Sequence, residues 1–388
     1  MTFDFNLYST PLLFAFTQAW IYALLFWRRG WRNERLSDWL LGSLLVAMAF
    51  EIWEYMLGFG GIEILWKALE FFPRNFGLLL PALAWFYLRS QFNSDFRFRR
   101  RDLLHALPFL LSVGYHLLVF FQGTAFVTYW KEAVHNRYGI NFLELGLKFA
   151  LHFVYFYKAY RLYQAYRQWA PNEFSNVEAV SFGWFRNFLL AFLSTFIISW
   201  GMLLIDLWLD LDFWHDWWGE LFKAGLIYYL CIAGYAQTQP RRILFVQAAA
   251  AEPVAGSCLA PGIKADKLAD ENVEKWRADL IRLMGEERPY LDPELTLTDL
   301  ARRLQTNPSL LSAAVNRAFG KNFNDYVNEY RVEEVKKLLN DPHYSHLSLL
   351  GIGLECGFNS KSTFNRAFRK ATGMAPGEWM RSKKVSGV

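Results

Sequence analysis

Long apolar runs dominate the first 238 residues of the chain. Each of them is near the ~20 residues that an α-helix needs to cross the hydrocarbon core of a bilayer. They cover residues 9–27, 37–59, 69–91, 103–121, 139–160, 185–209 and 219–238. A helix of a soluble protein normally keeps a polar face, and a stretch such as 186–205 has almost none. The pattern predicts about seven transmembrane helices, with a soluble helical core rich in aromatic residues as the alternative.

The runs are not equally regular. The third contains Arg74 and Pro81, and the fourth is the shortest and contains Pro108. The first is expected to be a span rather than a cleaved signal peptide, because Asp4 precedes it and arginines, not a small-residue cleavage site, follow it. The count of seven therefore depends most on the third and fourth runs.

Basic residues concentrate in alternate loops between the runs. The loops after the first, third, fifth and seventh runs hold Arg28, Arg29, Arg32, Arg35, Arg97, Arg99, Arg100, Arg101, Lys158, Arg161, Arg167, Arg241 and Arg242. Loops rich in Lys and Arg stay in the cytoplasm. We therefore expect a multi-pass protein of the cytoplasmic membrane, with its N-terminus outside and its C-terminal part in the cytoplasm.

Several ionisable residues lie inside the predicted spans, where burial in hydrocarbon is costly. A candidate ligand pocket is built from Glu51, Glu54, Arg74, His116, Glu144, Lys148, His152, Asp206 and Lys223. Most fall in the outer half of the predicted spans, so we expect a polar pocket open to the outside that binds an unknown small-molecule or membrane signal. Structural ion pairing between helices and positions at the membrane interface are the alternatives.

The remaining composition adds little chemistry. Aromatic residues make up 19% of the chain, which suits membrane interfaces. The three cysteines fall in different segments, and their spacing indicates neither a disulfide nor a zinc site. An acidic outer loop, 210–216, could bind a cation, but a solvated loop explains it as well. No catalytic triad, metalloprotease motif or phosphate loop is present in the sequence, so we expect no enzyme and no cofactor.

A change of composition separates the spans from the C-terminal part. Residues 239–266 are rich in Ala, Pro and Gly and predict a flexible tether. Residues 267–285 carry an apolar stripe at helical spacing, which packs either on the following domain or on a second protomer. The predicted domains are a membrane domain at 1–238, a linker at 239–287 and a third domain at 288–388, and a homodimer stays open.

The third domain is basic and rich in helix caps. It contains 15 Lys and Arg against 10 Asp and Glu, so it accounts for the formal net charge of +5 of the whole chain. The capping pattern 296–299 opens one helix, and Asn307-Pro308 opens the next, at 308–319. A long helix is expected at 323–339, and Ser360 caps another at 361–371. Two helix-turn-helix units, joined by the long helix, are therefore predicted.

These residues resemble the DNA-binding domain of the AraC family over about a quarter of the chain. The matching positions are Leu297, Leu300, Ala301, Pro308, Leu311, Ser312, Gly320, Lys321, Asn322, Phe323, Tyr326, Tyr330, Arg331, Leu338, Leu339, Ile352, Gly357, Phe358, Ser360, Ser362, Phe364, Arg366, Phe368, Lys370, Gly373 and Pro376. The chain departs from the family pattern at Val315, Gly353, Ala375 and Trp379. The resemblance implies an all-α domain with two helix-turn-helix units that enter successive major-groove segments of double-stranded DNA.

The second helix of each unit is the candidate reading helix. Base-facing positions implied by the resemblance are Ser309, Ser312, Ala313, Lys361, Ser362, Thr363 and Arg366. The full set of expected DNA contacts adds Asn316, Arg317, Asn365, Arg369 and Lys370. Arg366 can bind guanine or phosphate, and the small side chains of the first unit offer weaker base contacts.

Together these patterns predict a membrane-embedded one-component transcriptional regulator. Binding of a signal would change the pose or pairing of the DNA-binding domains, or proteolysis at Ala248–Ala251 would release them. A membrane transporter or membrane enzyme that uses the DNA-binding domain as a reporter is the alternative function.

Overall fold

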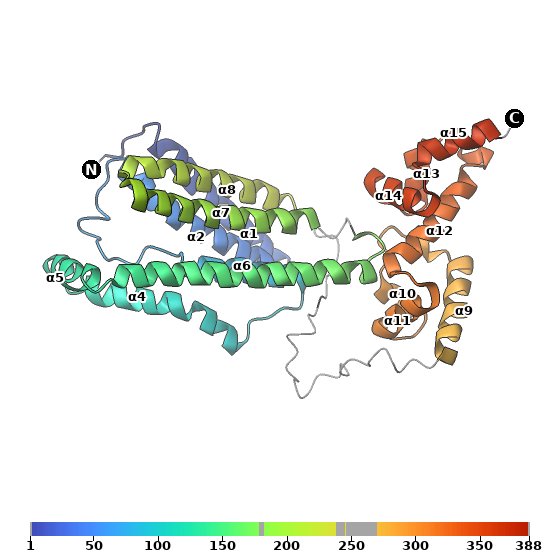
Figure 1. The fold of residues 1–388 in the computed structure, drawn as a ribbon, viewed down its shortest axis with the longest axis horizontal. Helices are drawn as coiled ribbons and strands as arrows, with labels where there is room; N and C mark the ends of the chain where they lie inside the picture. Colours follow the sequence, from blue (N-terminus) through green and yellow to red (C-terminus); the bar gives the residue numbers. More distant parts are fainter. Residues whose placement is uncertain (1, 178–181, 238–244, 246–269, 387–388) are drawn as a thin grey trace. The chain divides into compact units, whose positions relative to one another are not determined.

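The computed structural model describes residues 2–177, 182–237, 245 and 270–386. Within these residues every regular element is a helix, apart from one isolated β-bridge between Phe174 and Thr296. The chain forms two compact units (Figure 1). The first comprises residues 1–163 and 183–246, and the second comprises residues 164–182 and 247–388. The all-α fold class predicted from the sequence is confirmed for the described residues.

The N-terminal unit is a bundle of long helices. Its helices are α1 (Ser9–Arg32), α2 (Leu36–Phe59), α3 (Leu80–Phe92), α4 (Leu107–Phe120), α5 (Thr124–Trp130), the first part of α6 (Ile140–Glu173), α7 (Phe182–Leu209) and α8 (Trp217–Tyr235). Helix α1 packs against α2 and α8, and α2 also packs against α3 (Figure 1). Short helical turns, η1 (Arg100–Ala106), η2 (Lys131–Asn136) and η4 (Phe213–Asp216), complete this unit.

Among the described residues, four helical segments are long and apolar enough to cross a membrane. They are Ser9–Arg32, Leu36–Phe59, Arg100–Phe120 and Gly183–Asp206. They coincide with the first, second, fourth and sixth predicted runs. The fifth and seventh runs are also helical, in α6 and α8, but both helices carry charged side chains within their apolar stretch.

The third predicted run, 69–91, is wrong in its extent. Helix α3 has 13 residues, which is about 20 Å of helix and shorter than the ~30 Å hydrocarbon core. The preceding residues form turns, in which the guanidinium of Arg74 bonds to the carbonyls of Leu65 and Leu69 and to the carboxylate of Glu54. These bonds hold Arg74 in a loop instead of a span.

Residues 122–138, expected to be a loop, instead form α5 and η2. Val127 of α5 is buried in a small cluster with Phe71 and Val119. Tyr115, Phe120, Phe126 and Trp130 pack around this cluster. The apolar side chains of α5 thus pack against those of α4 and against Phe71.

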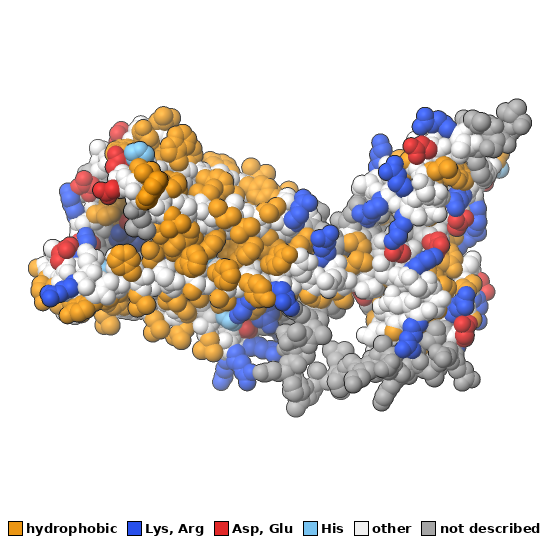
Figure 2. Space-filling view, viewed as in Figure 1, with side chains coloured by type: hydrophobic (Ala, Val, Ile, Leu, Met, Phe, Trp, Pro, Cys, Tyr) orange, Lys and Arg blue, Asp and Glu red, His pale blue; other side chains and the backbone are white. Residues whose placement is uncertain are grey.

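The face of the N-terminal unit that Figure 2 shows is largely apolar. Exposed large side chains of α6 and α7 include Phe142, Leu143, Phe153, Tyr157, Leu190, Ile197, Leu204 and Trp208. Soluble monomers rarely expose apolar patches of this extent. Side chains of this kind are typical of helices that face lipid.

In its described part, the C-terminal unit contains seven further α-helices. They are α9 (Asp270–Glu286), α10 (Leu297–Arg303), α11 (Pro308–Phe319), α12 (Phe323–Leu338), α13 (Leu349–Glu355), α14 (Lys361–Thr372) and α15 (Pro376–Ser386). The predicted helices 308–319, 323–339 and 361–371 agree with α11, α12 and α14 to within one residue at each end. Helix α12 contributes to two apolar cores, through Phe323 and Tyr326 to one and through Val332 and Val335 to the other. Each core belongs to one helix pair.

The predicted linker is described only in part. Most of the tether at 239–266 lies outside the described residues, as does the Ala248–Ala251 segment. Helix α9 packs against α11, and Leu280 and Met284 are buried in the first apolar core. The apolar stripe therefore covers the domain that follows it, which is the first of the two predicted alternatives.

Candidate functional site

The first helix pair, α10 and α11, is fixed by caps at both helix starts. The Thr296 hydroxyl accepts the backbone N–H of Asp299, whose carboxylate in turn accepts the backbone N–H of Thr296, both at 3.1 Å. The side chain of Asn307 accepts the backbone N–H of Ser309 at 2.8 Å, and Pro308 occupies the first helical turn. These side chains satisfy N–H groups that a helix start leaves unpaired. The predicted starts of both helices are confirmed.

The second pair, α13 and α14, turns at Gly357. This residue has φ of +90°, and a Cβ atom there would lie 2.5 Å from the backbone oxygen of Tyr290. Only glycine fits such a position without strain. Ser360 then caps α14 by accepting the backbone N–H of Thr363 at 3.1 Å. The departure at Gly353 has a local reason, because a Cβ there would lie 3.1–3.3 Å from the ring of Phe364.

The predicted DNA-contacting residues are placed on the second helix of each pair, and most of them reach the surface. Ser309, Asn316, Arg317, Lys361, Ser362, Asn365, Arg366, Arg369 and Lys370 are exposed, and Ser312 and Ala313 are half-buried. On α14, Phe364 and Phe368 are buried on the opposite face. Helix α14 thus presents a polar and basic face to solvent, with its apolar face in the core.

Thr363 differs from the expectation. Its side chain is 1% exposed, and its hydroxyl lies 3.0 Å from the Ser360 hydroxyl that caps α14. Thr363 therefore supports the helix start and offers no surface to DNA. Lys370 is exposed, but its ammonium group forms a 2.7 Å ion pair with Asp325 of α12. This pair links α14 to the long helix.

Arg331 of α12 lies in the interior of the C-terminal unit and is fully buried. Its Nε donates to the backbone oxygen of Tyr290, and its Nη2 donates to that of Asp292, both at 2.7 Å. Burial lowers the pKa of the guanidinium to about 10, with Asp292 acting in the opposite direction. Arg331 also lies 5.8 Å from the ring of Phe358, in the second core. One side chain thus connects the two helix pairs.

The end of α6 belongs to the same unit and completes the shell around Arg331. Ser175, which is fully buried, follows α6, and its hydroxyl accepts a hydrogen bond from Arg331 Nη2 at 3.1 Å. The backbone N–H of Ser175 donates to Leu295 at 3.2 Å, and its carbonyl accepts from the Asn324 side chain at 2.6 Å. This is a docking contact that the sequence analysis missed, because no periodicity or motif marks residues 174–176.

Glu173 and Phe174 extend this docking contact to the start of α10. The Glu173 carboxylate accepts from the hydroxyl of Thr298 at 2.5 Å, and Phe174 forms the β-bridge with Thr296. Burial raises the pKa of Glu173, and the bonds from Thr298 partly oppose that shift. The last turn of α6 therefore contacts the first helix pair directly.

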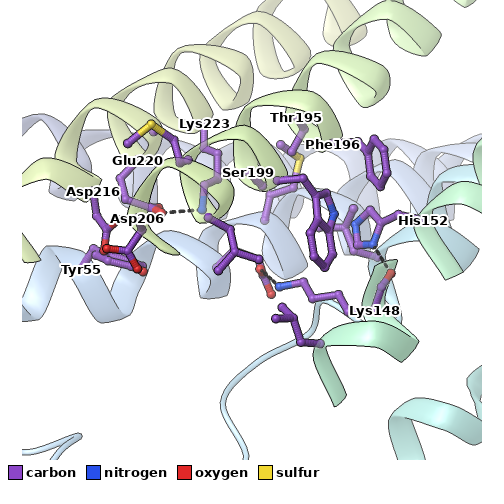
Figure 3. Close-up of a pocket in the computed structure, with 18 residues that line it drawn as sticks. Tyr55, Lys148, His152, Thr195, Phe196, Ser199, Asp206, Asp216, Glu220 and Lys223 are labelled. Carbon is purple, nitrogen blue, oxygen red and sulfur yellow. Dashed lines mark hydrogen bonds and ion pairs between the residues drawn. The ribbon is translucent and has the colours of Figure 1, made fainter. Parts of the chain in front are cut away.

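The nine predicted pocket residues divide between two cavities of the N-terminal unit. Glu51, Lys148, His152, Asp206 and Lys223 line a cavity of about 290 Å³ together with Tyr55, Asp216 and Glu220 (Figure 3). Glu54, Arg74, His116 and Glu144 line a second cavity of about 500 Å³, and Lys148 borders both. Sequence reasoning joined them because periodicity shows which residues share a helix face, but not which helices are neighbours.

Most of the charged side chains that line the second cavity form pairs with one another. The ion pair between Arg74 and Glu54 measures 2.9 Å, and the pair between Lys131 and Glu70 measures 2.7 Å. His116 lies 3.7 Å from Glu144. These pairs are the contacts expected from structural ion pairing, one of the alternatives predicted for these residues.

Comparisons with known proteins find matches in the C-terminal part of the chain. Residues 300–382 match a family model described as a helix-turn-helix domain. The chain is 28% identical over 121 residues to the uncharacterized HTH-type transcriptional regulator YtdP of Bacillus subtilis, covering 31% of this chain and 15% of that protein. It is 30% identical over 98 residues to the melibiose operon regulatory protein of Escherichia coli, covering 25% and 32%. No solved structure matches the chain.

These relatives define the class of the C-terminal domain. A third, the HTH-type transcriptional regulator CdhR of Pseudomonas aeruginosa, is 29% identical over 103 residues, covering 26% of this chain and 29% of that protein. The chain carries an AraC-type helix-turn-helix domain at its C-terminus. It spans less than a third of the length of each of these three relatives.

Proposed function

We propose that this protein is a membrane-embedded transcriptional regulator that binds double-stranded DNA in a sequence-specific manner. The observation that carries the proposal is the presence, in one chain, of four membrane-length apolar helices and a C-terminal AraC-type helix-turn-helix domain. In this proposal, the DNA-binding domain would recognise DNA at the inner face of the membrane.

Two helix-turn-helix units would read the DNA, with α11 and α14 as the reading helices. Both present polar side chains on their exposed faces, and α12 contributes to the core of each pair. The predicted contacts are Ser309, Ser312, Ala313, Asn316, Arg317, Lys361, Ser362, Asn365, Arg366, Arg369 and Lys370. Base readout is expected mainly from α14, because its base-facing positions include the long side chains of Lys361 and Arg366, whereas those of α11 are small.

Seven membrane crossings, α1 to α4 and α6 to α8, give the N-terminal unit its topology in this proposal. The basic residues that follow alternate crossings put the N-terminus outside and the DNA-binding domain in the cytoplasm. Helix α3 would complete its crossing with the turns that precede it, and non-helical backbone at membrane depth is tolerated when protein buries it. The 290 Å³ cavity lies at the C-terminal ends of α2 and α7 and the N-terminal ends of α6 and α8, which all point outward in this topology.

A signal bound in the N-terminal unit would reach the DNA-binding domain through α6. This helix is continuous from Ile140 to Glu173, so that its first part belongs to the N-terminal unit and its last ten residues to the C-terminal unit. Lys148 and His152 line the cavity on the same helix that ends beside the docking contact at Ser175. Release of the domain by proteolysis at Ala248–Ala251 is the competing mechanism, and only release yields a soluble fragment.

DNA binding by the membrane-embedded chain is tested directly with purified protein. The full chain in lipid nanodiscs is incubated with sheared genomic DNA of its host at ~0.15 M salt, and retained fragments are sequenced. The proposal predicts a small set of enriched fragments that share a motif. Uniform retention of all fragments, or none, would contradict sequence-specific binding, and empty nanodiscs are the control.

A further inference from the structure

The smaller cavity of the N-terminal unit has an excess of negative charge. Its lining includes the carboxylates of Glu51, Asp206, Asp216 and Glu220 and only two ammonium groups, those of Lys148 and Lys223. The formal net charge of this lining is therefore −2. In Figure 3, Asp206, Asp216 and Tyr55 lie together at one end of the cavity, and Lys148 and His152 lie at the other.

Each lysine already has a glutamate partner. Lys148 pairs with one oxygen of Glu51 at 2.9 Å, and Lys223 pairs with one oxygen of Glu220. The second oxygen of each glutamate is buried and has no hydrogen-bond partner. Glu220 is only 3% exposed, so water compensates it poorly. Two acceptor atoms are thus directed into a buried site without a donor.

The two aspartates add negative charge and have no ion-pair partner of their own, although Lys223, which is paired with Glu220, also attracts Asp216. The hydroxyl of Tyr55 bonds to Asp216, and Asp206 lies close enough to Asp216 to repel it. Neither aspartate forms an ion pair with a Lys or Arg among the described residues. A net negative charge beside apolar helices is costly, so the cavity favours an entering positive charge and repels an anion.

The walls of the cavity indicate the kind of cation. Tyr55, Phe196 and Trp200 line it together with the aliphatic side chains of Leu80 and Leu203. Aromatic faces attract ammonium groups, and a volume of about 290 Å³ is at the lower end of small-molecule sites. Among the described residues, no group of three His, Cys, Asp or Glu side chains is arranged to hold a metal ion. These walls suit an organic cation better than a bare ion.

We propose that this cavity binds a small organic ammonium cation from the outer side of the membrane. Its ammonium group lies between Asp206 and Asp216 and reaches the free oxygen of Glu220, and its carbon atoms contact Tyr55 and Trp200. The inference rests on the proposed function in one respect: the bound cation is taken to be the signal that changes DNA binding.

Ligand binding is measured on the full chain in lipid nanodiscs, without DNA. The probes are the chlorides of butylammonium, choline and putrescine, with sodium butyrate as the anion, butanol as the neutral analogue and calcium chloride as the metal. Isothermal titration calorimetry is expected to show saturable binding of at least one ammonium probe and no binding of butyrate, butanol or calcium. Binding of butyrate or calcium alone, or of no probe, would overturn the proposal.

Variants locate the bound probe. Asp206→Asn is expected to weaken ammonium binding at least tenfold, and so is Asp216→Asn, which is expected to fold because Asn also suits the helix start at that position. Glu63→Gln is the matched control, since Glu63 is exposed and pairs only with Lys67, outside the cavity. Equal affinity in the control and in both aspartate variants would place the probe elsewhere and refute the site.

The two proposals fail in different ways. If no ammonium probe binds while the same nanodiscs still enrich specific DNA fragments, the proposed ligand class is wrong. The proposal that the protein is a DNA-binding regulator would then still stand. If an ammonium probe binds but no DNA fragment is enriched, the cavity is a binding site of a protein with another function, and the link between occupancy and DNA binding is lost.

Discussion

The guanidinium of Arg331 and the hydroxyl of Ser175 are 3.1 Å apart in the interior of the C-terminal unit, although 156 residues separate them in sequence. Ser175 follows α6, and α6 begins in the N-terminal unit. The contact therefore attaches the segment that follows α6 to the buried residue that joins both helix pairs. In the proposed mechanism, this contact is where a movement of α6 would reach the DNA-binding domain.

Ser175→Ala tests this attachment. The substitution removes the acceptor of one Arg331 N–H in a buried site, so we expect a loss of about 1–3 kcal/mol in the stability of the C-terminal unit. Hydrogen exchange of the full chain should become faster at residues 290–296 and 328–332.

The matched control for this variant is Ser345→Ala. Ser345 is exposed and lies in the turn before α13, so its loss should leave exchange unchanged. Equal protection in both variants would show that the end of α6 does not stabilise the domain, and the route through α6 would have to be abandoned.

Gly357→Ala should disrupt the second helix pair. The new Cβ would lie 2.5 Å from the backbone oxygen of Tyr290, at a backbone φ of +90°. Backbone strain of this kind costs about 1–3 kcal/mol, and the clash adds to it. We expect the C-terminal unit to become sensitive to limited proteolysis at 25 °C. Gly377→Ala, where a Cβ meets nothing within 4 Å, should remain resistant. Equal resistance of the two variants would argue against the turn described here.

Arg366→Ala should weaken DNA binding. Arg366 is exposed on the polar face of α14, where a long cation can reach a phosphate or a guanine edge. We expect at least a tenfold loss of affinity for an enriched fragment, measured by fluorescence anisotropy. If affinity falls equally for all DNA sequences, and the slope of log affinity against log salt concentration decreases by about one, Arg366 contacts a phosphate. If the variant instead loses its preference for one base, Arg366 contacts that base.

Lys336→Ala is the control for Arg366→Ala. Lys336 is in the last turn of α12, where it pairs with Glu333, and it lies on neither reading helix. Its removal takes away the same charge. Equal losses of affinity in the two variants would indicate a general electrostatic effect instead of contact through α14.

The thiol of Cys356 should be inert in the folded protein. Burial raises the pKa of this thiol from its ordinary value near 9 to about 12. Because the folded-state pKa is raised, this contribution to stability is complete below pH 9 and is lost as the pH rises through about 12. At pH 8, N-ethylmaleimide should label the Cys356 peptide only after unfolding in urea, as read by mass spectrometry. Rapid labelling of the native chain would contradict the buried position.

Local signals made most of the C-terminal fold predictable from the sequence. Caps such as Thr296 with Asp299, and Asn307 with Pro308, act within three residues, so the starts of α10 and α11 could be placed in advance. The contact between Ser175 and Arg331 could not, because it depends on long-range packing. Thr363 was misplaced for a related reason: its spacing suits the exposed face of α14, but its hydroxyl turns back to the helix cap.

The N-terminal unit was predictable in outline only. Apolar length identified α1, α2 and α7, but it could not show that Arg74 would be held in a loop by Glu54. It also could not divide the polar residues between two cavities. That division depends on which helices lie next to α6. The hydrophobic periodicity of a single helix does not show which helices are its neighbours.

Chromatin immunoprecipitation with sequencing, combined with a blot of membrane and soluble fractions, tests the central claim most directly. The chain carries a C-terminal tag for both readouts. We predict discrete genomic peaks while the full-length protein is found only in the membrane fraction. Peaks that accompany a short soluble fragment would replace signalling through α6 with proteolytic release. An absence of peaks under every growth condition would contradict the account and favour a membrane transporter or enzyme.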